Sequence, residues 1–153
     1  MNIQSGLSIS LLLIWSGWVP SALAQIRPDR TLNQESTQLQ RQNNRIIING
    51  GAHRGSVLFH SFDQFGIPTN QSALFATPSN IESIVSRVTG NTPSNIDGTL
   101  SVRGAADLFL LNPNGIVFGP DAQLDIAGSF TASTSDRLTI DDLEFSAVAP
   151  VPV

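Results

Sequence analysis

Two short apolar runs meet at a polar corner in the segment Leu108-Phe109-Leu110-Leu111-Asn112-Pro113-Asn114-Gly115-Ile116-Val117-Phe118-Gly119. Each run has the length of a short β-strand and is too short for a typical helix. Pro113 fixes its own φ and cannot donate to a strand ladder, and Gly115 tolerates the positive φ that a corner requires. The two asparagines can bond their own backbone where the chain turns. The segment therefore predicts a strand, a corner and a second strand.

The same pattern repeats along most of the chain. Short apolar runs occur at 46–48, 57–59 and 74–76, and short segments that alternate apolar and polar residues occur at 98–102, 124–126, 130–132 and 138–140. Most of these segments are closed by Asn, Gly, Asp or Pro. Ile81, Ile84, Val85 and Val88 have helical spacing, but their β-branched side chains favour a turn into a strand. Strands of this length at this spacing predict an all-β fold.

The corners favour one all-β architecture over the others. They are built from Asn, Gly, Asp and Pro rather than from tight two-residue hairpin loops. A β-solenoid needs such corners, because each rung stacks about 4.8 Å above the previous one. Inward Leu, Ile, Val and Phe then form one continuous core, and corner asparagines can stack as hydrogen-bonded ladders. A β-sandwich or a closed barrel remains the alternative.

The N-terminus has a different texture from the rest. An apolar run at 7–19 precedes Ala22-Leu23-Ala24, which predicts a secretory signal peptide over residues 1–24 with cleavage between Ala24 and Gln25. The run is shorter than the roughly 20 residues of a membrane-spanning helix. Because residues 1–5 carry no Lys or Arg, an interfacial or lipid-anchored segment is the alternative, although the chain has no cysteine to carry a lipid. Residues 25–45 are polar and predict a loose lead-in or cap to a domain over 46–148.

Composition argues against nucleic acid as a partner and shows that disulfides do not stabilise the domain. The net charge is −4, and all eight basic residues are scattered arginines, so no basic cluster is present to neutralise phosphates. Nucleic acid is therefore not expected as a partner. With no cysteine, the exported domain must be held by packing and hydrogen bonds alone. A chain that crosses an outer-membrane pore unfolded is one class of protein that would need to lack cross-links.

The segment at 108–119 resembles the N-P-N-G-I motif of two-partner-secretion domains, the haemagglutination-activity domains found at the N-terminus of filamentous haemagglutinin. Three further passages match that family in order and spacing, and the resemblance covers about 46–148. They are Leu58-Phe59-His60-Ser61-Phe62-Asp63-Gln64-Phe65, Arg87-Val88-Thr89-Gly90 with Ile96-Asp97-Gly98-Thr99-Leu100, and Gly128-Ser129-Phe130-Thr131-Ala132-Ser133-Thr134. The form Phe59-His60-Ser61-Phe62 is similar to cyanobacterial members.

The resemblance implies a right-handed parallel β-helix of the pectin-lyase-like type with an N-terminal cap. It also implies export: the signal peptide delivers the chain to the periplasm, where POTRA domains of a dedicated outer-membrane β-barrel transporter recognise it. The chain then crosses the barrel and folds at the cell surface or in the medium. The transporter-recognition motif it implies is Asn112, Pro113, Asn114, Gly115 and Ile116.

This sequence departs from the family pattern in two places. The first family motif, N-P-N-L, corresponds to the weaker match Thr77-Pro78-Ser79-Asn80-Ile81, taken as a secondary motif. Family domains also run longer, so the chain is expected to be a fragment, a truncated product or a stand-alone domain. Any host or matrix target would then be bound through regions that lie downstream.

Two other classes of function fit the sequence less well than export does. A surface adhesin or carbohydrate-binding β-helix is the alternative, although no Trp or Tyr remains after residue 24 to stack on sugars. An enzyme is not expected, because His53 and His60 lack a Ser or Cys partner at a recognisable spacing. The aspartates at 121, 125, 136, 141 and 142 are read as solvated turn or strand acids rather than metal ligands. No catalytic residue, metal or cofactor is predicted.

Overall fold

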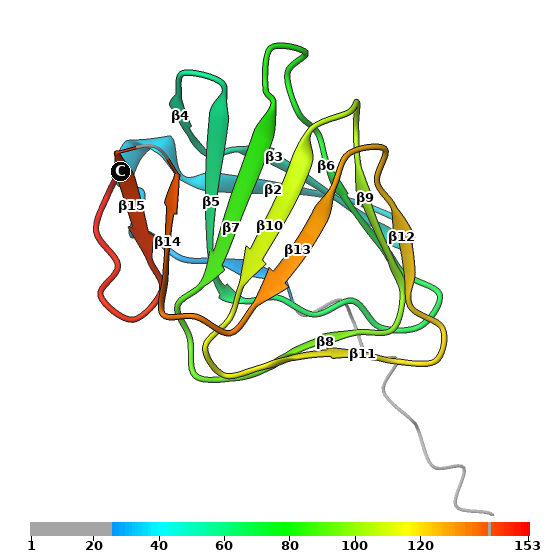
Figure 1. Cartoon of the computed structure of the whole chain (residues 1–153). Helices are drawn as coiled ribbons and strands as arrows, with labels where there is room; N and C mark the ends of the chain where they lie inside the picture. The colour runs from blue at the N-terminus through cyan, green and yellow to red at the C-terminus, as the bar shows by residue number, and fades with distance from the viewer. Residues whose placement is uncertain (1–25, 141) are drawn as a thin grey trace, which may run out of the picture.

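The computed structural model describes residues 26–140 and 142–153 (Figure 1). The predicted signal peptide and its cleavage site between Ala24 and Gln25 lie outside the described residues and stay a prediction. The elements are β1 (Arg27–Pro28), η1 (Asn33–Glu35), β2 (Thr37–Gln42), β3 (Arg45–Gly50), β4 (Ala52–Arg54), β5 (Val57–Gln64), β6 (Ser72–Phe75), β7 (Ser83–Val88), β8 (Ser94–Ile96), β9 (Thr99–Val102), β10 (Asp107–Leu111), β11 (Ile116–Phe118), β12 (Gln123–Asp125), β13 (Phe130–Ser133), β14 (Arg137–Ile140) and β15 (Leu143–Ser146).

Most strands stack in parallel on three faces. Face A contains β5, β7, β10 and β13, face B contains β3, β6, β9 and β12, and face C contains β8 and β11. The chain visits faces B, A and C in turn, so each circuit returns to the strand that it began beside. The descending strands of face A in front of face B show the right-handed winding in Figure 1. The expected right-handed parallel β-helix is confirmed.

The register explains the continuous core. Leu58 pairs with Ile84, Ile84 with Leu108 and Leu108 with Phe130, one rung above the next along face A. Because side chains alternate across a strand, these positions all point inward. The inward residues of faces A and B form one apolar cluster. The sandwich and barrel alternatives are wrong, because Leu110 pairs in parallel with neighbours on both sides.

Face A is also covered on its outer side. Phe59, Val85 and Leu111 point away from the solenoid core, and a second buried cluster forms around them with Phe145. The antiparallel hairpin of β14 and β15 packs Leu138, Ile140 and Leu143 against this cluster. β4 extends the edge of face A by pairing antiparallel with β5, and its Ala52 joins the same cluster. The apolar run over 108–111 is continuous for this reason: Leu108 and Leu110 face the core, while Leu111 and the partly buried Phe109 belong to the outer cluster.

The ends of the fold differ from the simple rung pattern. Residues 37–42, within the segment expected to be a loose lead-in, form the regular strand β2, which pairs antiparallel with β3. Residues 27–28 pair antiparallel with β5. The strand expected at 138–140 exists, but it belongs to the outer hairpin rather than to another rung. At the opposite end, β11, β12 and β13 are the last strands of their faces.

Candidate functional site

Residues 112–115 form a hydrogen-bonded turn where face A gives way to face C. The amide N of Gly115 donates to the carbonyl O of Asn112 over 3.0 Å, with Pro113 at the second position, where its fixed φ suits a β-turn. Gly115 has φ of +113°, a conformation that costs a residue with a side chain. The predicted corner is therefore present, and its proline and glycine stand where the backbone requires them.

Asn112 is buried rather than displayed. Its exposed fraction is 0%. Its Nδ2 donates to the carbonyl O of Thr92 and to Oγ of Ser94, each at 3.0 Å, and its Oδ1 accepts from the amide N of Asn114 at 3.0 Å. The side chain thus closes its own turn and fastens it to the previous rung. Because the Asn112 side chain is buried, the corner is not a simple solvent-exposed turn.

The other residues of the motif are more accessible. Asn114 is exposed, and its Nδ2 donates to the carbonyl O of Gly90 at 2.8 Å, a second link to the rung before. Pro113 and Ile116 are partly buried, and Ile116 packs against the core while it pairs with Ser94. The corner therefore presents one proline ring and one amide side chain to solvent.

The secondary motif lies elsewhere on the fold. Residues 77–81 connect β6 on face B to β7 on face A, so they precede a face A strand, whereas the corner at 112–115 follows one. Because β7 and β10 are parallel, the two motifs lie at opposite ends of face A. Thr77 and Ile81 are buried, while Pro78, Ser79 and Asn80 are exposed. The structure does not bring the two motifs into one site.

An exposed apolar surface follows the corner. Val117 and Phe118 on β11 are 53% and 43% exposed, and Leu124 on β12 is 49% exposed. The ring of Phe118 meets Phe130 edge-on at 6.0 Å between centroids. These side chains belong to the last rung, whose strands have a neighbour on one side only. Such an edge can accept an added strand. The exposure of Phe118 was not predicted from the sequence.

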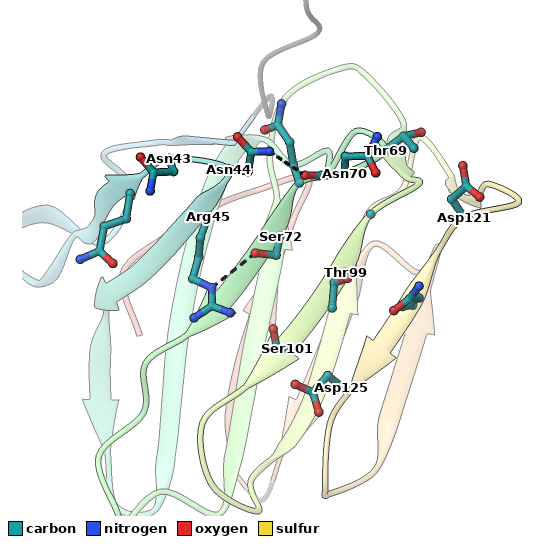
Figure 2. Close-up of a pocket in the computed structure, with 14 residues that line it drawn as sticks. Asn43, Asn44, Arg45, Thr69, Asn70, Ser72, Thr99, Ser101, Asp121 and Asp125 are labelled. Carbon is teal, nitrogen blue, oxygen red and sulfur yellow. Dashed lines mark hydrogen bonds between the residues drawn. The ribbon is translucent and has the colours of Figure 1, made fainter.

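A polar groove of about 730 Å³ crosses face B (Figure 2). Its floor follows the in-register column of Arg45, Ser72, Thr99 and Gln123, one residue from each rung. The turn residues Asn44, Thr69, Asn70 and Asp121 form one rim in Figure 2, and Asp125 lies further along β12. The groove brings together hydroxyl, amide and carboxylate groups from segments far apart in the sequence, which no local motif indicated.

The titratable groups have structural surroundings. His60 is buried against Phe62 and Phe75, its Nδ1 lies 3.2 Å from Oγ1 of Thr37, and burial lowers its pKa to about 3. Hydrogen bonds from Thr69 and from the amide of Asp121 lower the pKa of Asp97. Among residues 26–140 and 142–153, no group of three or more His, Asp or Glu is arranged to hold a metal ion.

Comparisons with known proteins place this parallel β-helix, with its capped beginning, outer hairpin and corner at 112–115, among secretion domains. A family model described as the TPS secretion domain matches residues 24–153. The chain is 33% identical over 93 residues to the heme/hemopexin-binding protein of Haemophilus influenzae, which covers 61% of this chain and 10% of that protein. The crystal structure of the filamentous hemagglutinin secretion domain matches with a TM-score of 0.60 and 26% identity, over 76% of this chain and 44% of that chain.

The chain belongs to the TPS secretion domain family, the N-terminal domains of two-partner-secretion exoproteins. Members of this family pair with outer-membrane transporters and are secreted or surface-exposed, and the family is one of secretion domains rather than an enzyme family. The described residues contain no helix long and apolar enough to cross a membrane. The similarity to cyanobacterial members stays a prediction.

Proposed function

We propose that this domain is the export signal that a cognate outer-membrane transporter recognises, and that recognition precedes folding. The observation that carries the order of events is the burial of Asn112, whose exposed fraction is 0%. A partner cannot read the Asn112 side chain in the folded domain. In an extended chain the same residue is accessible, and the apolar runs on either side of it can add as strands to an exposed sheet edge of a POTRA domain.

Folding outside the cell then supports export. A solenoid can nucleate at one end and propagate rung by rung, since each rung contacts its neighbours. The polar links of Asn112 and Asn114 to residues of the previous rung form as the next rung is laid down. Chain that has folded at the surface no longer fits back through the pore, so folding draws the remainder outward without ATP. The signal peptide over residues 1–24 delivers the chain to the periplasm.

The first test asks whether the corner at 112–115 is required for export. The chain is co-expressed with its transporter in a bacterium that lacks other two-partner systems, and export of the Asn112→Ala/Asn114→Ala variant is measured. Asn95→Ala, at an exposed position on β8, is the matched control. We expect the double variant to lose most export while the control retains it. Full export of the double variant would count against the motif.

A binding experiment then addresses the order of events. The periplasmic POTRA domains are immobilised and exposed to chain kept unfolded by dilution from urea, and separately to refolded chain. We expect the unfolded chain to bind and the refolded chain to bind at least ten-fold more weakly. Equal binding of both would place recognition on the folded surface instead, where Pro113 and Asn114 are accessible.

A surface adhesin is the second candidate, favoured by the groove on face B. Its floor has one polar side chain per rung, and rungs about 4.8 Å apart present a regular row of hydrogen-bonding groups to an extended chain of sugars. Binding there would rest on hydrogen bonds from Arg45, Thr99 and Gln123 rather than on aromatic stacking. A glycan array with the wild type and with Thr99→Ala/Gln123→Ala tests it, and the absence of binding to any glycan would reject it.

A further inference from the structure

A fully buried guanidinium joins segment 29–31 to segment 145–151. Arg87 lies on β7 with an exposed fraction of 0%, and strand alternation points its side chain out of face A, beside Val85 rather than Ile84. Burying a charge in this way is costly unless every donor finds an acceptor. A rung can form without a buried arginine on its outer side. The role of Arg87 is therefore inferred from its hydrogen-bond partners.

The partners of Arg87 come from three separate parts of the chain. Nε donates to Oγ of Ser61 on β5 at 2.8 Å, and Nη2 donates to Oγ1 of Thr31 in the N-terminal segment at 2.8 Å. Nη1 donates to the carbonyl O of Ser146 at 2.9 Å, and Nη2 also reaches the carbonyl O of Val151 at 3.1 Å. The N-terminal segment and segment 146–151 therefore meet at one side chain.

Further contacts complete the enclosure of the charge. The guanidinium carbon of Arg87 lies 4.0 Å from the centroid of Phe145, whose ring face attracts a cation. Thr31 and Ser61 in turn donate to the carboxylate of Asp29, so two hydroxyls relay the opposite charge to the arginine. Although burial acts to raise it, hydrogen bonds from Thr89, Thr31 and Ser61 lower the pKa of Asp29. Burial lowers the pKa of Arg87 to about 10, which leaves it protonated at neutral pH.

The order in which these contacts can form follows from the chain. Before residues 29–31 and 145–151 reach face A, Arg87 stands on the outer side of β7 in water, where a guanidinium is well solvated. It does not oppose rung formation in that state. Its partners extend from residue 29 to residue 151, so the complete set of bonds closes only after the rungs between them are in place. Contacts of such sequence separation form late because loop-closure entropy opposes them.

We propose that Arg87 is a late-closing lock: its guanidinium ties segment 29–31 to segment 145–151 and holds the rungs between them against unfolding. This rests on the proposed function, since slow unfolding would keep chain that has folded outside the cell from returning. Arginine suits the role and lysine does not, because a guanidinium presents five N–H donors in a rigid fork to these acceptors, whereas an ammonium has three donors on one atom. Arg87 is thus a positioning residue of the exported state, and it is not a contact for the transporter.

Folding kinetics of residues 25–153 in urea test the lock. A residue whose contacts form after the transition state changes the unfolding rate and leaves the folding rate alone. For Arg87→Met we expect unfolding to be faster by on the order of 100-fold, because a buried charge network is broken, with refolding unchanged within about two-fold. Arg87→Lys should unfold nearly as fast as Arg87→Met. Arg103→Met, at an exposed arginine, is the matched control and should alter neither rate.

Two outcomes would overturn the lock: slower refolding of Arg87→Met with an unchanged unfolding rate, or no change in either rate. Should Arg87→Met fail to fold, Thr31→Val removes one acceptor of the same network and is read in the same way, with unfolding about ten-fold faster expected. These measurements need no transporter, so failed export of the wild-type chain would count against the proposed function and leave the lock standing. In the binding experiment, unfolded Arg87→Met should bind the POTRA domains like the wild type. In the export assay, the variant should reach the medium but be degraded by added protease faster than the wild type.

Discussion

Nδ2 of Asn112 lies 3.0 Å from Oγ of Ser94, and both side chains are completely buried between two successive rungs. The bond joins the corner after β10 to the first residue of β8, which the chain laid down one circuit earlier. Residue 112 is therefore a structural asparagine in the folded domain. In the proposed function, the same side chain has a second role, because the transporter recognises it in the unfolded chain.

The first prediction concerns the two asparagines of the corner. Asn112→Ala removes two donated bonds and leaves the amide of Asn114 without its acceptor, so we expect a loss of about 2–4 kcal/mol in the free energy of unfolding. Asn114→Ala, at an exposed position, should cost less than about 1 kcal/mol. Urea denaturation monitored by circular dichroism measures both. Equal losses for the two variants would contradict the structural role assigned to Asn112.

The second prediction follows from the buried histidine. His60 must stay neutral to remain in the core, and burial lowers its pKa to about 3, below its ordinary value near 6.5. The unfolded chain therefore binds a proton that the folded chain excludes as pH falls below about 6.5. His60 costs no stability above that pH, and we expect the free energy of unfolding to fall by up to about 1.4 kcal/mol per pH unit from there toward pH 3.

Urea midpoints between pH 7.5 and pH 4 measure this slope, and a His60→Gln variant should reduce it. His53→Gln, at an exposed position, is the control and should keep the wild-type slope. Because carboxylates also titrate below about pH 5, the informative window is pH 5–7. A wild-type chain of constant stability across that window would show that His60 is not held neutral.

The third prediction concerns a close approach of the backbone at Gly98. A Cβ added to Gly98 would lie 2.3 Å from the carbonyl O of Gln71 and 2.5 Å from that of Pro68, and neither can move without breaking the turn before β6. We expect Gly98→Ala to cost at least about 2 kcal/mol, which thermal unfolding followed by circular dichroism would record. At Gly115 the added Cβ meets nothing closer than 3.8 Å, so Gly115→Ala should cost only the strain of its positive φ, about 1 kcal/mol. A Gly98→Ala variant as stable as the wild type would contradict this packing.

Much of the solenoid was predictable from the sequence because rung positions carry their signal locally. The strands at 107–111 and 116–118 flank a corner whose proline and glycine are required by backbone geometry. The ambiguous stretch 81–88 became strand β7 because its alternate residues face two different apolar clusters, which also produces the helical spacing. The signal of the corner and the apolar spacing of 81–88 are both local in the sequence, although the clusters that bury residues 84, 85 and 88 also contain residues from other rungs.

The parts that could not be predicted depend on distant contacts. β8 is Ser94-Asn95-Ile96, which has no apolar run and is held as a strand by its pairing with β11. β2 is polar, and its pairing with β3 supplies its order. The burial of Arg87 depends on Thr31 and Val151, which are 120 positions apart in the sequence, and the groove on face B depends on the register of four strands. No local pattern encodes these relationships.

The fourth prediction compares two buried serines that face the solenoid interior. Within the described residues, Oγ of Ser86 has no hydrogen-bond partner, although its exposed fraction is 0%. Ser86→Ala removes a desolvated hydroxyl that gains nothing, so we expect the free energy of unfolding to rise by about 1 kcal/mol. Ser94 is equally buried, but its Oγ accepts from Asn112, so Ser94→Ala should lower the free energy of unfolding by about 1–3 kcal/mol. Serine-to-alanine substitution should therefore raise the free energy of unfolding at one inward position and lower it at the other, and urea denaturation of the two variants side by side measures both changes.

Loss of stability in both variants would mean that Ser86 has a hydrogen-bond partner in solution. No loss in either variant would remove the support for the link between Asn112 and the rung before it.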